Sequence, residues 1–158
     1  MNQAYIKTPI GNIEIEGDDQ GITAITFLNE EIVPTIKIPV SLQEAVTQLD
    51  EYFKKQRVVF SLKLNPKGTD FQCKVWQELQ TIPFGKTASY LDMAKNLGDP
   101  KVIRAAASAN GKNPISIVIP CHRVIGSDGS LTGYGGGLHR KKWLLDHESP
   151  VRQGLLFN

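Results

Sequence analysis

Apolar and polar positions alternate through the first part of the chain, and glycines interrupt the alternation at short intervals. This pattern runs from Ala4 to Leu28. Strict alternation between turn residues is typical of half-buried strands joined by tight turns. We therefore predict a β-meander in this segment. The apolar positions are Ile13, Ile15, Ile22, Ile25 and Phe27, and the glycines are Gly11, Gly17 and Gly21.

The pattern then changes to helical spacing, which predicts a helix over residues 42–55. Its apolar positions are Leu42, Ala45, Val46, Leu49 and Phe53. Ser41 and Glu44 have the spacing of a capping box, so we expect the helix to begin there. A short strand over 60–64 would complete this part of the fold. The turn-forming residues at 65–68 favour a linker.

Thr69 and Gln72 can cap a helix that ends before Pro83. Two further helices are predicted after it. The first of the two runs from Ser89 or Tyr90 to Asn96. The second has Asp99 as its cap and runs from Pro100 to Asn110. Two helices joined by a short turn with a glycine are a helix-turn-helix candidate. The second helix carries Arg104 within an alanine run, which would serve either close helix packing or close approach to DNA.

These elements together predict an α/β fold of the α+β kind with two lobes. The amino-terminal lobe, residues 1–66, would hold a small β-sheet and one helix. The carboxy-terminal lobe, residues 67–158, would be mostly helical and contain the helix-turn-helix. The tail after Ser149 carries no functional signal.

Composition narrows the class of protein. No apolar stretch approaches the roughly 18 residues that a membrane span needs, so we expect a cytoplasmic protein without a membrane partner. The two cysteines, Cys73 and Cys121, lie far apart, which argues against a disulfide framework and a structural zinc site. A reduced thiol is the expectation.

Charge is distributed unevenly along the chain. Residues 101–142 hold seven basic side chains and one acidic one, Asp128, so this segment carries +6 and the rest of the chain −4. Such a field suits a polyanion, although a solvated basic face would look the same. Its expected members are Arg104, Lys112, Arg123, Arg140, Lys141 and Lys142.

Candidate chemistry follows the β-branched run 115–119, which is typical of a buried strand. The run ends in Pro120-Cys121-His122-Arg123. A cysteine beside a histidine and an arginine would have its nucleophilic thiolate favoured electrostatically. Adjacent side chains in an extended segment point apart, so a bridging water is an alternative to direct Cys121–His122 contact. Taken alone, the pair is also compatible with an inert buried cysteine.

The segment Ile119-Pro120-Cys121-His122-Arg123-Val124 resembles the active-site signature of the O6-alkylguanine-DNA alkyltransferases. The resemblance covers residues 69–148 through several motifs in order. They are Thr69-Asp70-Phe71-Gln72-Cys73-Lys74-Val75-Trp76, Ile82-Pro83-Phe84-Gly85-Lys86-Thr87, Ser89-Tyr90, Arg104-Ala105, Asn113-Pro114, Tyr134-Gly135-Gly136-Gly137-Leu138, Lys142-Trp143-Leu144-Leu145 and His147-Glu148.

The resemblance implies a catalytic set. Cys121 would accept the alkyl group, His122 would take the thiol proton through a water, and Glu148 would stabilise the imidazolium. Tyr90 would donate a hydrogen bond to the departing guanine. Asn113 would hold the active-site turn in register. From pattern alone, Glu148 would be taken for a surface charge.

The resemblance also implies a substrate, double-stranded DNA bearing O6-alkylguanine, and a way to reach the damaged base. The nucleotide must leave the stack, and Arg104 would take its place, with Ala105 beside it on a helix in the minor groove. The base pocket would be lined by Val124, Tyr134, Gly135 and Gly136. The carbonyl of Val124 would read the guanine amino group.

The implied reaction is DNA repair by stoichiometric, irreversible transfer, because the product is a thioether. O4-alkylthymine is a second possible substrate. No cofactor, metal or obligate protein partner is expected. Some relatives bind zinc through amino-terminal cysteine and histidine, but this chain has neither residue type before Cys73.

Departures from the family and rival functions complete the hypothesis. Alkyltransferase-like relatives lack the acceptor, whereas Cys121 is present, and the small Gly135 and Gly136 suggest room for large adducts. One rival is a non-catalytic DNA-binding module. The other is a cysteine hydrolase, which would need an oxyanion hole that the sequence does not indicate.

Overall fold

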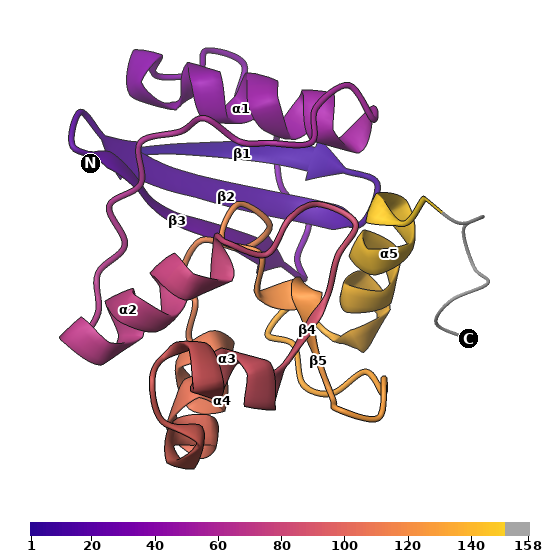
Figure 1. Cartoon of the computed structure of the whole chain (residues 1–158). Helices are drawn as coiled ribbons and strands as arrows, with labels where there is room; N and C mark the ends of the chain where they lie inside the picture. The colour runs from indigo at the N-terminus through magenta and orange to yellow at the C-terminus, as the bar shows by residue number, and fades with distance from the viewer. Residues whose placement is uncertain (151–158) are drawn as a thin grey trace. The chain divides into compact units, whose positions relative to one another are not determined.

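The computed structural model describes residues 1–150 and divides into two compact units (Figure 1). The first unit comprises Met1–Lys67 together with Pro114–Ser116. The second comprises Gly68–Asn113 and, among the described residues, 117–150. The predicted mixture of a small sheet and helices is confirmed, and each unit is described by itself.

The first unit contains the predicted β-meander. Strands β1 (Asn2–Thr8), β2 (Gly11–Asp18) and β3 (Gly21–Leu28) form an antiparallel sheet in that order. Ala4 pairs with Ile15, which pairs with Ile25, and all three are buried on one face. Helix α1 (Val40–Phe53) packs on the sheet, as Figure 1 shows. The helix buries Leu42, Ala45, Leu49 and Tyr52.

The start of α1 differs from the prediction. The helix begins at Val40 with Pro39 as its cap, and no side chain caps it. Ser41 therefore lies inside the helix, and its Oγ accepts a hydrogen bond from Asn2 Nδ2 at 2.7 Å. The predicted capping box with Glu44 is wrong because Pro39, held extended at ψ 142°, starts the helix two residues earlier.

Two predicted strands are reduced to single bridges on β3. At 60–64 only Leu64 bridges to Ile22, and at 115–119 only Ile115 bridges to Ile25. In the second case Ile117 adopts a φ of 73°, which turns the chain out of extended geometry. The apolar run is buried as expected, but its backbone forms turns and not a strand.

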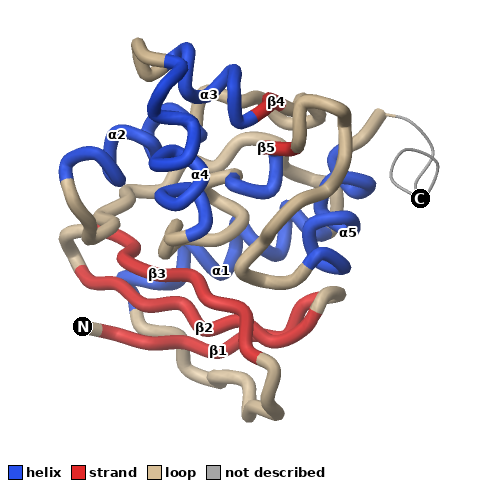
Figure 2. The backbone as a smooth tube through the Cα atoms, turned by 90° about the horizontal axis from the view of Figure 1, so that it is seen from below, coloured by secondary structure: helices blue, strands red, loops and turns tan. Residues whose placement is uncertain are grey.

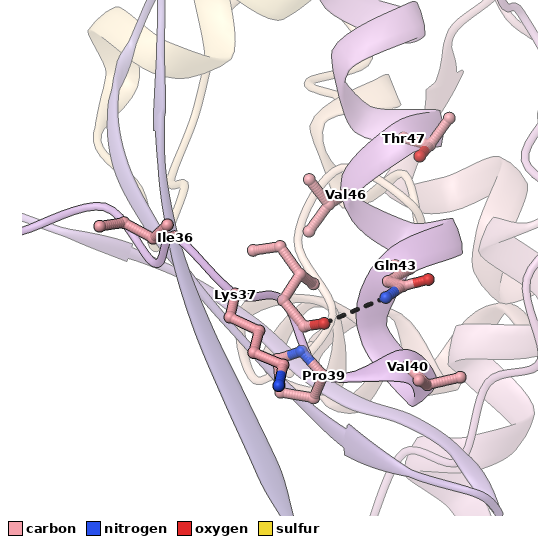
Figure 3. Close-up of a pocket in the computed structure, with 8 residues that line it drawn as sticks. Ile36, Lys37, Pro39, Val40, Gln43, Val46 and Thr47 are labelled. Carbon is pink, nitrogen blue, oxygen red and sulfur yellow. Dashed lines mark hydrogen bonds between the residues drawn. The ribbon is translucent and has the colours of Figure 1, made fainter.

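A groove lies between the segment before α1 and the first turns of that helix (Figure 3). Gln43 Nε2 donates to the carbonyl of Ile38 across it at 3.2 Å. The neighbouring Ile36 and Val40 are exposed apolar side chains. The groove belongs to the first unit and contains none of the candidate site residues.

The second unit begins with α2 (Asp70–Leu79), which has the predicted capping box between Thr69 and Gln72. Helix α3 (Tyr90–Asn96) is capped by Ser89. The following helix starts differently from the prediction, because Asp99 caps a short 3₁₀ helix, η1 (Pro100–Val102), before α4 (Ile103–Gly111). Together α3 and α4 form the predicted helix-turn-helix arrangement.

The alanine run of α4 serves helix packing on one face. Ala106 and Ala109 are buried, and the indole Nε1 of buried Trp76 on α2 donates to the carbonyl of Ala109 at 2.9 Å. Arg104 and Ala105 are exposed. Small residues thus allow close packing of α2 on α4 while leaving the arginine in solvent.

Two short strands place the start of the helix-turn-helix beside the cysteine segment. Strand β4 (Ala88–Ser89) pairs in parallel with β5 (Val124–Ile125), with Ala88 opposite Val124 (Figure 2). The 3₁₀ helix η2 (Cys121–Arg123) directly precedes β5. The last described helix is α5 (Leu138–Glu148). Within residues 1–150, no helix has the length and apolar character to cross a bilayer.

Candidate active site

Cys121 is the first residue of a tight turn, not the last of a strand. Its amide donates to the carbonyl of Ile119 at 2.8 Å, and the same carbonyl accepts from Asn113 Nδ2 at 2.7 Å. Cys121 is 6% exposed. A buried turn that has few local hydrogen bonds needs outside donors, and Asn113 supplies one. The turn therefore holds the thiol in a defined position.

His122 and Glu148 form a buried pair. Nε2 of His122 lies 2.8 Å from Oε2 of Glu148, and their side chains are 0% and 1% exposed. Nδ1 of His122 is also buried and has no hydrogen-bond partner among the described residues. The imidazole is therefore oriented through one nitrogen, and the other remains available for proton transfer.

Arg123 completes this cluster, a role that the sequence analysis missed. Its Nε donates to Glu148 Oε1 at 2.7 Å and its Nη2 to Oε2 at 3.0 Å. Its Nη1 donates to the carbonyl of Ile82 at 2.7 Å, and the guanidinium lies 5.9 Å from the ring centroid of Phe84. A bidentate arginine is the usual partner of a buried carboxylate. A buried carboxylate needs a cation beside it, so a buried role for Glu148 would have pointed to a partner such as Arg123.

The cluster controls the charge on Glu148. Burial alone would raise the pKa of this carboxyl group. The charge of His122 and the hydrogen bonds from His122 and Arg123 outweigh burial and hold the pKa well below its usual range. Glu148 is therefore a carboxylate at neutral pH and can stabilise an imidazolium on His122.

The thiol of Cys121 does not receive the electrostatic support that we expected from its neighbours in sequence. Burial raises the pKa of Cys121, and the hydrogen bond from Asn113 and the charge of Lys141 offset this only in part. His122 and Arg123 both face Glu148. The expectation was wrong because the side chains of His122 and Arg123 are directed to the carboxylate of Glu148 and not to the sulfur.

Lys141 is a second functional candidate that the sequence analysis placed elsewhere. It was expected in a solvent-facing basic field, but it is fully buried. Its Nζ donates to the carbonyls of Val124 and Thr132, each at 2.7 Å. Burial lowers its pKa to about 8. Lysine is among the residues least often buried completely, so no pattern signal would have identified it.

The other predicted pocket residues lie around this turn. Tyr90 is the first residue of α3, and its hydroxyl accepts from Thr132 Oγ1 at 3.4 Å. Tyr134 is half-buried in the loop that precedes α5. A Cβ built on Gly135 would lie 3.9 Å from the carbonyl of Gly111, and the carbonyl of Gly136 accepts from Arg140 Nη1 at 3.1 Å. The loop is therefore tied to α5 and lies close to the end of α4.

The basic field is smaller than predicted. Arg123, Arg140 and Lys141 are buried, each donating to backbone carbonyls, and Lys142 is half-buried and pairs with Asp146 at 2.8 Å. The exposed members are Lys101, Arg104 and Lys112. In the described part of the chain, Arg104 makes no side-chain hydrogen bond or ion pair. It is free to contact another molecule.

A metal centre was not expected. Within residues 1–150, no group of three or more histidine, cysteine, aspartate or glutamate side chains is placed to hold an ion. The side chains that act on the Cys121 thiol are the amide of Asn113 and the ammonium group of Lys141.

Two protein-family models match the chain. The 6-O-methylguanine DNA methyltransferase ribonuclease-like domain matches residues 1–66, and the DNA binding domain of the same protein matches residues 70–150. A methylated-DNA–protein-cysteine methyltransferase of Methanosarcina acetivorans is 43% identical over 155 residues, covering 94% of this chain and 98% of the relative. That of Mycobacterium bovis is 44% identical over 147 residues, covering 90% and 89%.

Solved structures agree. The crystal structure of Mycobacterium tuberculosis O6-methylguanine methyltransferase has a TM-score of 0.81 at 43% identity, covering 91% of this chain and 90% of that one. The structure of Mycobacterium tuberculosis OGT in complex with DNA has a TM-score of 0.85 at 42% identity, covering 94% and 93%. The chain therefore belongs to the methylated-DNA–protein-cysteine methyltransferase family.

Proposed function

We propose that the protein repairs DNA by transferring an alkyl group from O6 of guanine to Sγ of its own Cys121. The sulfur attacks the carbon attached to O6, a carbon–sulfur bond forms and the carbon–oxygen bond breaks. The electron pair of the broken bond stays on guanine, which takes up a proton. The activity for which the related proteins are named, methyl transfer from methylated DNA to a protein cysteine, supports this step.

The observation that carries the proposal is the buried His122–Glu148 pair next to the cysteine, with Nδ1 of His122 unpartnered among residues 1–150. Because the pKa of Cys121 is raised, the thiol needs a base at neutral pH. His122 takes the proton through a water molecule, and Glu148 stabilises the imidazolium. Arg123 keeps Glu148 charged and in place.

The pocket residues act on the base. Tyr90 donates a hydrogen bond to the guanine ring as negative charge develops on it. The carbonyl of Val124 accepts from the guanine amino group, and Asn113 holds the turn at Cys121. Tyr134, Gly135 and Gly136 form the open wall. The two glycines leave space for large O6 adducts, and O4-alkylthymine is a second substrate.

Exposed Arg104 supports a role in DNA binding. An alkyl group inside a duplex is out of reach of a buried thiol, so the nucleotide must be flipped out. Arg104 enters the stack in its place from α4 in the minor groove, and the small, exposed Ala105 beside it permits close approach of the helix. Lys101 and Lys112 contribute charge toward phosphate.

A thioether is not reversed by thiol exchange, so each molecule acts once. We also propose that the protein works in the cytoplasm, where thiols stay reduced, and without an obligate protein partner. The two rivals are a DNA-binding module without transfer and a cysteine hydrolase. Retention of Cys121 beside His122 opposes the first, and an exposed arginine on a helix-turn-helix has no purpose in the second.

The test is to incubate the protein with a duplex that carries one O6-methylguanine, then to measure intact mass and to map the modified peptide. We expect one methyl group per molecule, on Cys121, with no further turnover. An unmodified protein that still binds the duplex would favour the DNA-binding module. Repeated turnover of an ester or peptide would favour the hydrolase.

A further inference from the structure

Asn110, near the end of α4, carries a buried polar group that the fold does not use. The residue is 6% exposed, and its Oδ1 is buried without a hydrogen-bond partner among residues 1–150. No hydrogen bond joins the rest of its amide to the described residues either. A buried acceptor without a donor destabilises the folded protein, and an apolar side chain of the same shape would avoid that cost. A ligand therefore explains the amide better than folding does.

The chain neighbours of Asn110 place it at the wall of the proposed base pocket. Ala109, which precedes it, is held against α2, because its carbonyl accepts from Trp76 Nε1 at 2.9 Å. Gly111, which follows it, faces the open wall of residues 134–136, since a Cβ built on Gly135 would lie 3.9 Å from the carbonyl of Gly111. The end of α4 therefore lies between α2 and this wall.

Asn110 is also linked to the residue that contacts the reacting sulfur. Its carbonyl accepts from the backbone amide of Asn113 at 3.3 Å. The side chain of Asn113 hydrogen-bonds the thiol of Cys121 and donates to the carbonyl of Ile119 at 2.7 Å. One turn of chain therefore separates the unused amide from the residue that positions the nucleophile.

The guanine ring offers no free donor for the unused acceptor. Alkylation at O6 leaves N1 without its proton, so the amino group is the one donor left on the base, and the proposed pocket assigns that group to the carbonyl of Val124. The alkyl group extends from the carbon that Cys121 attacks toward the open wall. A donor on the alkyl group itself is therefore the partner that fits Oδ1 of Asn110.

We propose that Asn110 is a specificity-determining residue, which favours O6 adducts that carry a hydroxyl group next to the reacting carbon, the 2-hydroxyethyl group being the simplest. The inference rests on the proposed function, because it names a substrate class for the same site. The hydroxyl donates to Oδ1 of Asn110 while Sγ of Cys121 bonds to the reacting carbon and the bond from that carbon to O6 breaks. The hydroxyl passes unchanged onto the sulfur substituent, and guanine takes up a proton.

The first experiment compares the parent protein with Asn110→Leu, which keeps the size of the side chain and removes its polar atoms. Single-turnover rates are measured on duplexes that carry O6-(2-hydroxyethyl)guanine, O6-propylguanine or O6-methylguanine. The first two adducts have nearly the same size, so the ratio of their rates isolates the hydroxyl. We expect Asn110→Leu to lower this ratio about tenfold, the effect of one buried neutral hydrogen bond, and to leave the methyl rate near that of the parent.

The comparison between proteins removes the difference in intrinsic reactivity of the adducts, because that difference is the same for both proteins. Asn96→Leu, at an exposed position at the end of α3, is the matched control and should leave the ratio unchanged. An equal loss of rate on all three adducts would overturn the inference, since a residue that contacts the base or supports the turn acts on every substrate alike. An unchanged ratio would also overturn it.

Chemical denaturation gives a second readout that separates specificity from structure. We expect the midpoint of Asn110→Leu to be no lower than that of the parent, because the substitution removes a buried acceptor without a partner. A lower midpoint with an unchanged ratio would assign Asn110 to the fold and overturn the inference. Asn110→Ala removes the amide without a new apolar branch, and the same fall in ratio is expected from it.

The methylated duplex keeps the two proposals apart. If the parent protein does not take up the methyl group from O6-methylguanine, the proposed function fails. If the parent takes up the methyl group and the ratio is the same in parent and variants, this inference alone fails.

Discussion

Oε2 of Glu148 lies 2.8 Å from Nε2 of His122 and 3.0 Å from Nη2 of Arg123, so one buried carboxylate orients the side chains of two consecutive residues. Removal of one member of such a group leaves a buried charge without its partner. Glu148 therefore links the stability of helix α5, which it ends, to the acid–base chemistry of His122 at the cysteine turn.

Glu148→Gln tests this link through stability. We expect the free energy of unfolding at neutral pH to fall by about 3 kcal/mol, because Arg123 and His122 lose a buried partner charge. The folded-state pKa of Glu148 is lowered, so its stabilisation is complete above the unfolded value of about 4.3 and is lost as pH falls toward the folded value. The difference between the two proteins should shrink in acid, as followed by chemical denaturation at several pH values.

The same substitution should slow alkyl transfer at neutral pH, because the imidazolium on His122 loses its stabilising charge. The measurement is single-turnover kinetics with a duplex that carries O6-methylguanine. A stability gap that is constant with pH, or an unchanged transfer rate, would contradict the assigned role of Glu148. Asp50→Asn, in an exposed ion pair with Lys54, is a control for which little change is expected.

Cys121→Ala should abolish transfer and preserve DNA binding. The thiol is the proposed acceptor, and the loss of one sulfur from the turn leaves Asn113 still bonded to the carbonyl of Ile119. Intact mass after incubation with the damaged duplex measures transfer, and fluorescence anisotropy measures affinity. Cys73→Ser is the matched control and should still gain one methyl group. Methylation of the Cys121→Ala protein would remove Cys121 from the acceptor role.

Arg104→Ala should impair nucleotide flipping in duplex DNA without impairing the alkyl-transfer step itself. The side chain is exposed on α4 and is not part of the cluster at Glu148. We expect a loss of at least tenfold in the rate on duplex DNA, equivalent to about 1.4 kcal/mol. Reaction with free O6-benzylguanine should not change. Equal losses on both substrates would show that Arg104 does not act in nucleotide flipping.

Gly135 and Gly136 predict tolerance of large adducts. We expect O6-benzylguanine to compete with the methylated duplex and to consume Cys121, because neither glycine places a side chain in the pocket. Gly135→Tyr should reduce this reaction more than reaction with the methylated duplex. Competitive titration followed by thiol counting checks both. Failure of the benzylated base to consume the thiol would contradict a roomy pocket.

Local sequence signals predicted much of the fold. The glycine-punctuated alternation predicted the β-meander, and the capping box of Thr69 and Gln72 predicted the start of α2. These features succeed because they depend on residues within one turn or one hairpin. The capping box at Ser41 failed because Pro39 started the helix first, and Ser41 bonds to distant Asn2.

Strand prediction at 60–64 and 115–119 failed for a different reason. A β-branched run signals burial, but it does not determine whether an edge is available for pairing over its full length. Here each segment meets β3 at one residue, and Ile117 turns the chain away at a positive φ. The apolar character was interpreted correctly and the backbone geometry was not.

The sequence by itself determined the family, through ordered motifs around Cys121 and His122, and the helix-turn-helix that carries Arg104. Only the tertiary structure decided which charges are inside. Arg123, Lys141 and Glu148 look like surface residues in a linear pattern, because burial of a charge depends on partners that lie far away in the chain. The carboxylate of Glu148 and the carbonyls of Ile82 and Thr132 provide those partners, and they meet only when the second unit folds.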